Sequence, residues 1–331
     1  SFFSRSARSS ASALLPLAVG PAMSIRGPCT AFPEISFVLI ARVLAEPVPS
    51  EASLQSLETA LSAAGQPFAE AMMLEHCGEV LEISIPEGTR DVVAPLVEEH
   101  LAPVAALFAD DTIAIPRLLV SDMDSTMIGQ ECIDELADFL GVKAQVAEIT
   151  ERAMRGELDF AGALDERVAL LEGLEETAIE QCLAQRISPT RGAGTVIATL
   201  SAHGARCVLV TGGFHRFADP IAERLGFDRV VGNRLLIEDG KLSGKVQKPI
   251  CDSATKERTL REEAAELGDG ARTLALGDGA NDTPMLRAAD YGVAYRAKPA
   301  TRAAANGWID CEDMTALLLL LGIDRKSWVR R

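Results

Sequence analysis

The sequence predicts an α/β protein in which a mostly parallel sheet, interrupted by an inserted helical segment, follows a smaller α+β domain. Three observations predict this fold class. From about residue 117 onward, short apolar strand patterns alternate with helical ones. A helix-rich stretch over residues 130–203 separates the first of these strands from the second. Before residue 117, the patterns follow the order β-α-β-β-α-β, which is that of a ferredoxin-like unit.

The first domain is expected over residues 23–116, and its elements have local signals. An apolar run at 36–44 predicts a strand. Amphipathic spacing after it predicts a helix with Ser50 as N-cap, ended by Gly65. The remaining expected elements are strands over 67–74 and 80–86, a helical pattern over 90–109 and a short strand over 112–115.

This element order resembles that of small amino-acid-sensing modules of the ACT type. The resemblance is topological, and the loop 44–52 (LAEPVPSEA) lacks the glycine that commonly approaches an effector in that family. We therefore expect a dimerising or packing domain, so that a homodimer is possible, with amino-acid sensing as the alternative.

The second domain is expected over residues 117–322, followed by a tail over 323–331. Strand patterns that enter glycine-containing turns predict parallel strands joined by helices. Asp239-Gly240 predicts a hairpin turn. The expected elements are a strand ending at 121, a strand over 207–214, a helix to 226, a hairpin over 235–246, a helix over 253–267, strands near 273 and over 291–295, and a final helix.

Composition narrows the classes of function. The chain has 331 residues with a net charge of −16, which disfavours binding to nucleic acid or to an anionic membrane surface. Its seven cysteines form no C-x-x-C pair, which favours a reducing, cytoplasmic setting. The longest apolar run, at 316–322, is far below the ~20 residues of a membrane span.

The first 22 residues differ in composition from the rest. They carry Arg5 and Arg8, several serines and no acid. We expect an unstructured or upstream-translated extension before Met23, with an organellar transit peptide as the alternative.

The stretch LLVSDMDSTMIGQ at residues 118–130 combines a buried strand with two carboxylates one residue apart. Asp122 and Asp124 lie on the same side of an extended chain, where they repel each other and lose hydration together. A hard cation such as Mg²⁺, which prefers oxygen ligands, would remove this conflict.

Two further strand ends carry complementary groups. The segment TGG supplies the Thr211 hydroxyl and a glycine turn at a helix start, where backbone N–H groups can approach an anion. The segment GDGAND adds Asp278 and Asp282, and Lys256 lies near the start of a helix. A carboxylate nucleophile, a metal, a hydroxyl and a lysine are the parts required for phosphoryl transfer through an aspartyl phosphate.

In this order, DMDST, TGGF, Lys256 and GDGAND resemble the motifs of the haloacid-dehalogenase-like (HAD) phosphatases. The segments 129–141 and 160–174 are similar to phosphoserine phosphatases in particular. The resemblance implies a Rossmann-like core with an inserted helical cap. It also implies Mg²⁺-dependent hydrolysis of the small molecule O-phospho-L-serine through an aspartyl phosphate, the last step of L-serine biosynthesis.

The resemblance assigns roles to the acidic residues. Asp122 would attack phosphorus and bind Mg²⁺, which Asp278 would also bind. Asp124 would protonate the leaving oxygen, then activate water, and its backbone carbonyl would complete the metal ligands. Asp282 would not bind the ion itself but would hold the metal-binding residues in place from the next layer of side chains.

The resemblance also assigns the substrate contacts. Glu131 would pair with the substrate ammonium, and Arg167 would hold its carboxylate in a bidentate geometry. Apolar residues Met154 and Phe160 would line the closed pocket. The groups expected to hold the phosphoryl group are Thr211, Gly212, Lys256 and Asn281. This chain has threonine at 211 where many close members have serine, and either hydroxyl can donate.

Three alternatives stay open. The phosphoryl group could pass to another alcohol such as homoserine, as in a phosphotransferase. The enzyme could hydrolyse small phosphomonoesters broadly. In a different class, the chain could be chiefly an amino-acid sensor through its first domain.

Overall fold

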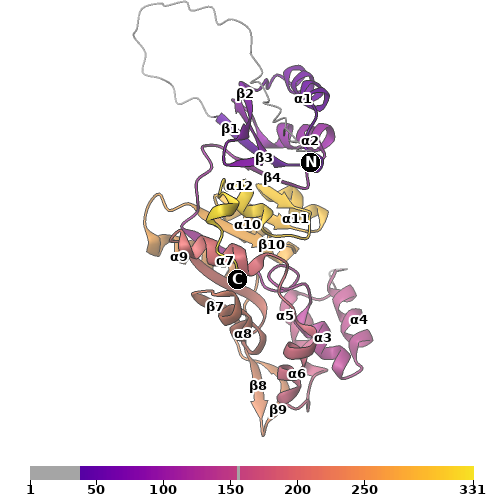
Figure 1. Cartoon of the computed structure of the whole chain (residues 1–331). Coiled ribbons are helices and arrows are strands. Elements are labelled where there is room, and N and C mark those ends of the chain that lie inside the picture. Colours follow the sequence, from indigo (N-terminus) through magenta and orange to yellow (C-terminus); the bar gives the residue numbers. More distant parts are fainter. Residues whose placement is uncertain (1–37, 155–156) are drawn as a thin grey trace, which may run out of the picture. The chain divides into compact units, whose positions relative to one another are not determined.

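The computed structural model describes residues 38–154 and 157–331 (Figure 1). The expected extension over residues 1–22 lies outside the described residues. Across the described part, an α/β fold with a mostly parallel sheet in its larger portion confirms the predicted fold class.

The first portion has the predicted β-α-β-β-α-β order. Its elements are β1 (Val38–Leu44), α1 (Glu51–Ala63), β2 (Glu70–Leu74), β3 (Cys77–Pro86), α2 (Arg90–Leu101) and β4 (Ala105–Ala109). The strand order is β2-β3-β1-β4, and neighbours are antiparallel, as in a ferredoxin-like sheet. Ser50 is the N-cap of α1, and its side chain accepts a hydrogen bond from the N–H of Ser53, as predicted.

The prediction for the end of this portion was wrong in one respect. A helical pattern over 90–109 and a strand over 112–115 were expected, but α2 ends at Leu101 and the last strand is Ala105–Ala109. Ala102 has a φ of 45° and Pro103 follows it, which together end the helix. The strand is almost entirely buried, so its sequence is an unbroken apolar run that periodicity cannot separate from a helix.

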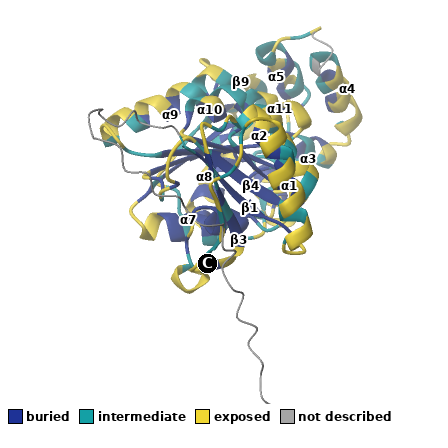
Figure 2. Cartoon of the chain, turned by 90° about the horizontal axis from the view of Figure 1, so that it is seen from above, coloured by how far each residue is buried: buried dark blue, intermediate teal, exposed yellow. Residues whose placement is uncertain are grey.

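The larger portion contains the predicted parallel sheet. Its strands are β5 (Leu118–Ser121), β6 (Arg206–Phe214), β7 (Arg229–Asn233), β10 (Thr273–Gly277), β11 (Tyr291–Tyr295) and β12 (Gly307–Ile309). They lie in the order β12-β11-β10-β5-β6-β7, and all these pairs are parallel. Figure 2 shows the strands buried between helices whose outer faces are exposed.

Helices on the two faces of this sheet position the strand ends. They are α7 (Ala193–Ala202), α8 (His215–Leu225), α9 (Ser253–Leu267), α10 (Thr283–Ala288) and α11 (Pro299–Ala304). The last α-helix of the chain, α12 (Ala316–Leu320), instead contacts β1, β3 and β4. None of the helices in the described residues is long and apolar enough to cross a membrane.

The inserted helical cap comprises α3 (Cys132–Phe139), α4 (Lys143–Met154), α5 (Phe160–Ala169) and α6 (Thr177–Arg186). The hairpin of β8 (Leu235–Glu238) and β9 (Lys241–Val246) packs against α5. Its turn residues, Asp239 and Gly240, both have positive φ, as the predicted hairpin turn requires.

The expected cap boundary at residue 203 requires correction. The helix α7 falls inside the expected insertion, but it packs against β6 and α8 of the core. Its buried residues Val196, Ile197 and Leu200 join the core cluster that covers the parallel sheet. Helical periodicity alone cannot show which surface a helix packs on, and therefore the boundary was placed too late.

The two sheets join into one of ten strands, which the sequence did not predict. Strand β4 pairs antiparallel with β12, with Trp308 opposite Ala106. The helix α12 covers the second face of the first portion through contacts with β1, β3 and β4. On that face Arg42 donates from Nη1 to the carbonyl of Leu320 at 2.9 Å and pairs with Glu82 at 2.7 Å. The first portion is therefore built into the core.

Substituting Gly307 by Ala should destabilise the protein by disrupting the β4–β12 junction. A Cβ atom at Gly307 would overlap the carbonyl oxygen of Ala106 and lie 3.0 Å from Leu107 Cα, both of them backbone atoms. We expect the free energy of unfolding to fall by about 1–3 kcal/mol, measured by urea denaturation. Gly78→Ala in β3 is the matched control because its added methyl meets nothing within 4 Å. Equal midpoints for the two variants would contradict a close-packed junction.

Candidate active site

Three adjacent strands of the parallel sheet, β10, β5 and β6, end at one cavity of about 680 Å³. Asp122 and Asp124 follow β5, Asp278 follows β10, and Thr211 lies near the end of β6. Ligands of open α/β sheets bind at the carboxyl ends of the strands, where these side chains gather.

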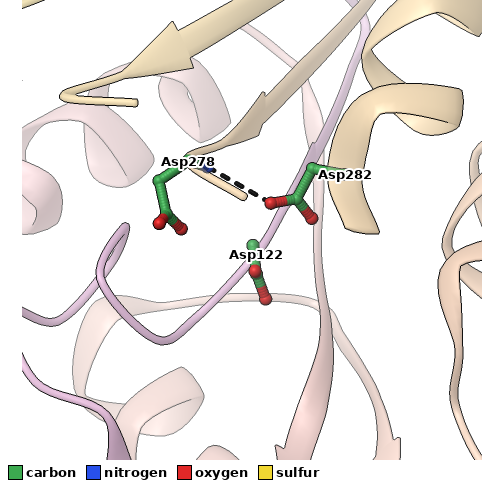
Figure 3. A group of neighbouring side chains, drawn as sticks. All are labelled: Asp122, Asp278 and Asp282. Carbon is green, nitrogen blue, oxygen red and sulfur yellow. Dashed lines mark hydrogen bonds between the residues drawn. The ribbon is translucent and has the colours of Figure 1, made fainter. Parts of the chain in front are cut away.

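An acidic cluster lies at the base of this site, with Asp122 and Asp278 lining the cavity and Asp282 behind them. Oxygen atoms of Asp122, Asp278 and Asp282 lie within 4.8 Å of one another (Figure 3). Burial, followed by the charge of Asp282, raises the pKa of Asp122 well above its ordinary value. The same two causes raise the pKa of Asp278 to about 6. The charged forms of Asp122 and Asp278 are therefore disfavoured in this buried setting, and a nearby positive charge would stabilise them.

Asp282 is fully buried, and both of its oxygens already have partners. Oδ1 accepts a hydrogen bond from Lys256 Nζ at 2.7 Å. Oδ2 accepts from the backbone N–H groups of Asp278 at 3.2 Å and Gly279 at 3.0 Å. A Cβ atom at Gly277 would overlap the Asp282 carboxyl group, so this approach requires glycine there. Asp282 thus fixes the loop that carries Asp278.

Lys256 connects this loop to the first strand end. Its Nζ also lies 2.7 Å from Asp122 Oδ2, and only 1% of the side chain is exposed. Burial lowers the pKa of Lys256, but the charges and hydrogen bonds of Asp122 and Asp282 outweigh burial and raise it overall. The lysine is therefore held as a fixed positive charge against Asp122.

The donor set fits a divalent cation. Asp122 Oδ1 accepts one bond, from the N–H of Met123, and Asp278 Oδ1 accepts one, from the Thr126 hydroxyl at 3.2 Å. Carboxylate oxygens have further lone pairs available. Asp122 and Asp278 line the cavity and can thus supply the oxygen ligands that Mg²⁺ prefers, whereas Asp282 lies behind them with both oxygens hydrogen-bonded.

Asp124 lies between the cap and the glycine turn. Its Oδ1 accepts from the N–H of Cys132, the first residue of α3, at 3.1 Å. A Cβ atom at Gly213 would lie 2.8 Å from Asp124 Oδ2, so glycine leaves room for this carboxyl. Burial, followed by the charge of Glu131, raises the pKa of Asp124 to about 7.

The glycine turn presents a hydroxyl and backbone groups to the cavity. Thr211 is buried, and its Oγ1 accepts from the N–H of Gly213 at 2.9 Å, which leaves the hydroxyl proton free to donate. Gly212 packs under the cap, because a Cβ atom there would lie 3.2 Å from Cζ of Phe160.

Two charged residues of the cap face the same cavity. Glu131 is the N-cap residue of α3 and accepts at Oε1 from the Ser125 hydroxyl at 2.7 Å. Arg167, on α5, donates from Nε to the Ala163 carbonyl at 3.2 Å. Burial raises the pKa of Glu131 and lowers that of Arg167. Opposite charges are thus available on the lid side of the cavity.

The structure brings most of the predicted site residues to one cavity wall. Those that line it are Asp122, Asp124, Glu131, Arg167, Thr211, Gly212, Asp278 and Asn281, with Phe160 from the cap. Lys256 and Asp282 do not line the cavity but lie behind it, Lys256 in contact with Asp122. The side chain of Met154 lies outside the described residues.

Sequence reasoning missed Lys298 and Asn233. Lys298 lines the cavity from the loop after β11, and its place beyond a strand end was a usable signal. Asn233 ends β7, a short strand that was not predicted; its amide donates to the Gly212 carbonyl and accepts from the N–H of Cys251.

Comparisons with known proteins agree with this geometry. The family model of haloacid dehalogenase-like hydrolases matches residues 119–287. Phosphoserine phosphatase SerB2 of Mycobacterium tuberculosis is 43% identical over 75% of this chain and 62% of its own length, so this chain spans about three fifths of that relative. A phosphoserine phosphatase of Albidiferax ferrireducens is 45% identical over 62% of this chain and 89% of its own length. The crystal structure of a HAD family hydrolase from Salmonella enterica serovar Typhi has a TM-score of 0.71 at 27% identity, covering 86% of this chain and 98% of that one.

Substituting Lys256 by Met should destabilise the fold strongly, since it leaves Asp122 and Asp282 buried without their cation. We expect a loss of roughly 3–5 kcal/mol in the free energy of unfolding, measured by urea denaturation. Lys248→Met is the control: Lys248 pairs with Asp165 at 2.8 Å, but both side chains are exposed, so its loss should be below about 1 kcal/mol. Similar losses for both lysines would show that the buried cluster does not depend on Lys256.

Proposed function

We propose that this chain, which belongs to the haloacid dehalogenase-like hydrolase family, hydrolyses O-phospho-L-serine to L-serine and inorganic phosphate. The observation that carries the proposal is one cavity with two chemistries. Its floor has Asp122 and Asp124 beside the Thr211 turn, and its lid side has Glu131 and Arg167. The names of the relatives support the same substrate. The reaction would be the last step of L-serine biosynthesis.

Mg²⁺ is the cofactor that this proposal requires. Asp122 and Asp278 would hold it through their carboxylates, and Asp124 through its backbone carbonyl. The bound ion would neutralise charge on the phosphoryl oxygens. Burial and the charge of Asp282 raise the pKa of Asp122 and of Asp278, and a bound cation would oppose this by stabilising their charged forms.

Asp122 acts as the nucleophile in the proposed reaction. One of its oxygens attacks phosphorus, the bond from phosphorus to the serine oxygen breaks, and an aspartyl phosphate forms. Lys256 orients the carboxylate through its contact with Oδ2 at 2.7 Å, and the N–H of Met123 holds Oδ1. The attacking group is thereby aimed before substrate arrives.

Asp124 transfers protons at both stages. It gives a proton to the departing serine oxygen, and it then takes one from a water molecule that attacks the aspartyl phosphate. Its bond from the Cys132 N–H ties this carboxyl to the start of the cap, so cap position and acid position are linked. The attack of water restores Asp122 and releases phosphate.

The phosphoryl group would be held by the glycine turn and its neighbours. The Thr211 hydroxyl has a proton to donate, Gly212 offers its N–H, and Asn281 lines the cavity beside Asp278. Lys256 supplies positive charge from behind Asp122. These groups would stabilise charge on the equatorial oxygens of the transition state.

Selectivity would come from the cap. Glu131 would pair with the ammonium of phosphoserine, and Arg167 would bind its carboxylate. Both side chains are substantially desolvated, which their pKa directions reflect, and a desolvated charge gains more from a fitting ion pair.

We retain residues 23–116 as an ACT-like accessory domain in this proposal, with a packing rather than a sensing role. The α12 helix covers the second face of its sheet, and Arg42 donates a hydrogen bond to the carbonyl of Leu320.

We further propose a cytoplasmic location. The six cysteines among the described residues are all free, which supports a reducing, cytoplasmic setting.

Phosphate release from a panel of phosphomonoesters tests the function directly. We expect Mg²⁺-dependent release that is strongest with phospho-L-serine, and a loss of roughly 1,000-fold or more for Asp122→Asn with the fold intact by circular dichroism. Broad release would indicate a general phosphatase. Phosphate found on an added alcohol such as homoserine would indicate transfer instead. Retained turnover in Asp122→Asn would exclude this residue as the nucleophile.

Substrate fragments separate the two cap residues. Arg167→Met should raise KM for phospho-L-serine about 10- to 100-fold, the effect of losing a charged hydrogen-bonded pair, but hardly change KM for phosphoethanolamine, which has no carboxylate. Glu131→Gln should raise KM for phospho-L-serine but not for 3-phosphooxypropionate, which has no ammonium. Steady-state kinetics on the three esters measure this. If each variant raised KM equally for all three esters, the two residues would maintain the structure of the cap and would not bind the ammonium and carboxylate of the substrate.

A further inference from the structure

The glycine turn of the active site is a bulge between two paired strands. Val210 of β6 lies opposite Val231 of β7, and Phe214 lies opposite Asn233. Three residues, 211–213, therefore face a single residue, Gly232, on the neighbouring strand. A bulge of this kind removes backbone groups from the ladder, and buried ones then require other partners.

The side chain of Asn233 supplies one of these partners. Its Nδ2 donates to the Gly212 carbonyl at 2.8 Å, and the residue is only 2% exposed. Gly232 leaves space for the bulge to pack down, since a Cβ atom there would lie 3.3 Å from Thr211 Cγ2 and 3.4 Å from the Gly213 carbonyl oxygen. The bulge is thus held at its middle residue by a buried amide.

The same amide binds a second segment. Asn233 Oδ1 accepts from the N–H of Cys251 at 2.7 Å, and Nδ2 lies 3.5 Å from the Cys251 carbonyl oxygen. Cys251 directly precedes Asp252, the N-cap of α9, whose side chain accepts from the N–H of Thr255 at 2.8 Å. Lys256 lies in the first turn of this helix and reaches Asp122.

We propose that Asn233 is a positioning residue that sets the distance between the Thr211–Gly213 turn and Lys256. It does not line the cavity, so it acts on a phosphate only through Gly212 and through the start of α9. The inference rests on the proposed function, because the turn and the lysine are its phosphoryl-binding groups. An amide donates from its nitrogen and accepts at its oxygen, so two separate atoms of Asn233 can bridge two segments, which an apolar side chain cannot do.

The direct test is the affinity for inorganic phosphate in the presence of Mg²⁺, measured by isothermal titration calorimetry. Asn233→Ala should weaken phosphate binding roughly tenfold or more, since small displacements of aligned groups have effects of this order. It should raise KM for phospho-L-serine and for phosphoethanolamine by the same factor, so the ratio of the two KM values stays unchanged. The cap variant Arg167→Met should change this ratio, because it raises KM for phospho-L-serine only.

The matched control is Asn306→Ala. Asn306 Oδ1 accepts from the N–H of Gly292 at 2.9 Å, so this variant also removes an amide hydrogen bond to the backbone, outside the cavity lining. It should lose stability without losing phosphate affinity. Unchanged phosphate affinity in Asn233→Ala, while the wild type binds phosphate and turns over phosphoserine, would overturn the inference.

A second variant covers poor folding. Asn233→Leu keeps the number and branching of the side-chain heavy atoms without the amide, and it should weaken phosphate binding as Asn233→Ala does. If neither variant folds while Asn306→Ala does, the role of Asn233 is structural and the positioning inference fails. A wild type that neither binds phosphate nor hydrolyses phosphoserine would instead refute the proposed function.

Discussion

The site depends on one electrostatic constraint: several carboxylates are buried together, and one lysine is held between two of them. Lys256 contacts Asp122 and Asp282 at 2.7 Å each, and all three side chains are almost completely buried. Burying charged groups is costly, so such a cluster is stable only when each buried charge has an oppositely charged or hydrogen-bonding partner. Asp122, which belongs to this lysine-bridged pair, and Asp278, which lies beside it, line the cavity and are the carboxylates that could hold a cation.

The backbone around the cluster is shaped to permit this packing. Gly277 leaves room for Asp282, and Gly213 leaves room for Asp124. The bulge in β6 places its backbone toward the cavity, and Asn233 satisfies what the bulge removes from the ladder. A catalytic arrangement that needs close approach of side chains to main chain therefore appears in the sequence as glycines at strand ends.

The joined sheet changes how the accessory domain is understood. The β4–β12 pairing and the cover provided by α12 make residues 38–109 part of one packed body with the parallel sheet. A module that sensed amino acids independently would be expected to share a smaller and more polar contact with the core. Residues 38–109 thus contribute to stability through backbone pairing with the parallel sheet, and they are not a separate module joined to it by a flexible linker.

Local patterns by themselves determined much of this protein. The alternation of strands and helices, the Ser50 cap, the Asp239-Gly240 turn and the acidic and glycine motifs at strand ends are all short-range signals, and the parallel sheet then brought those ends together. Glu131 and Arg167 carry no such signal and were found only through a family resemblance. The tertiary structure alone decided the β4–β12 junction, the strand at 105–109, the surface on which α7 packs, and the role of Asn233. Each of these depends on which distant segment is adjacent, and burial against that segment overrides local propensity.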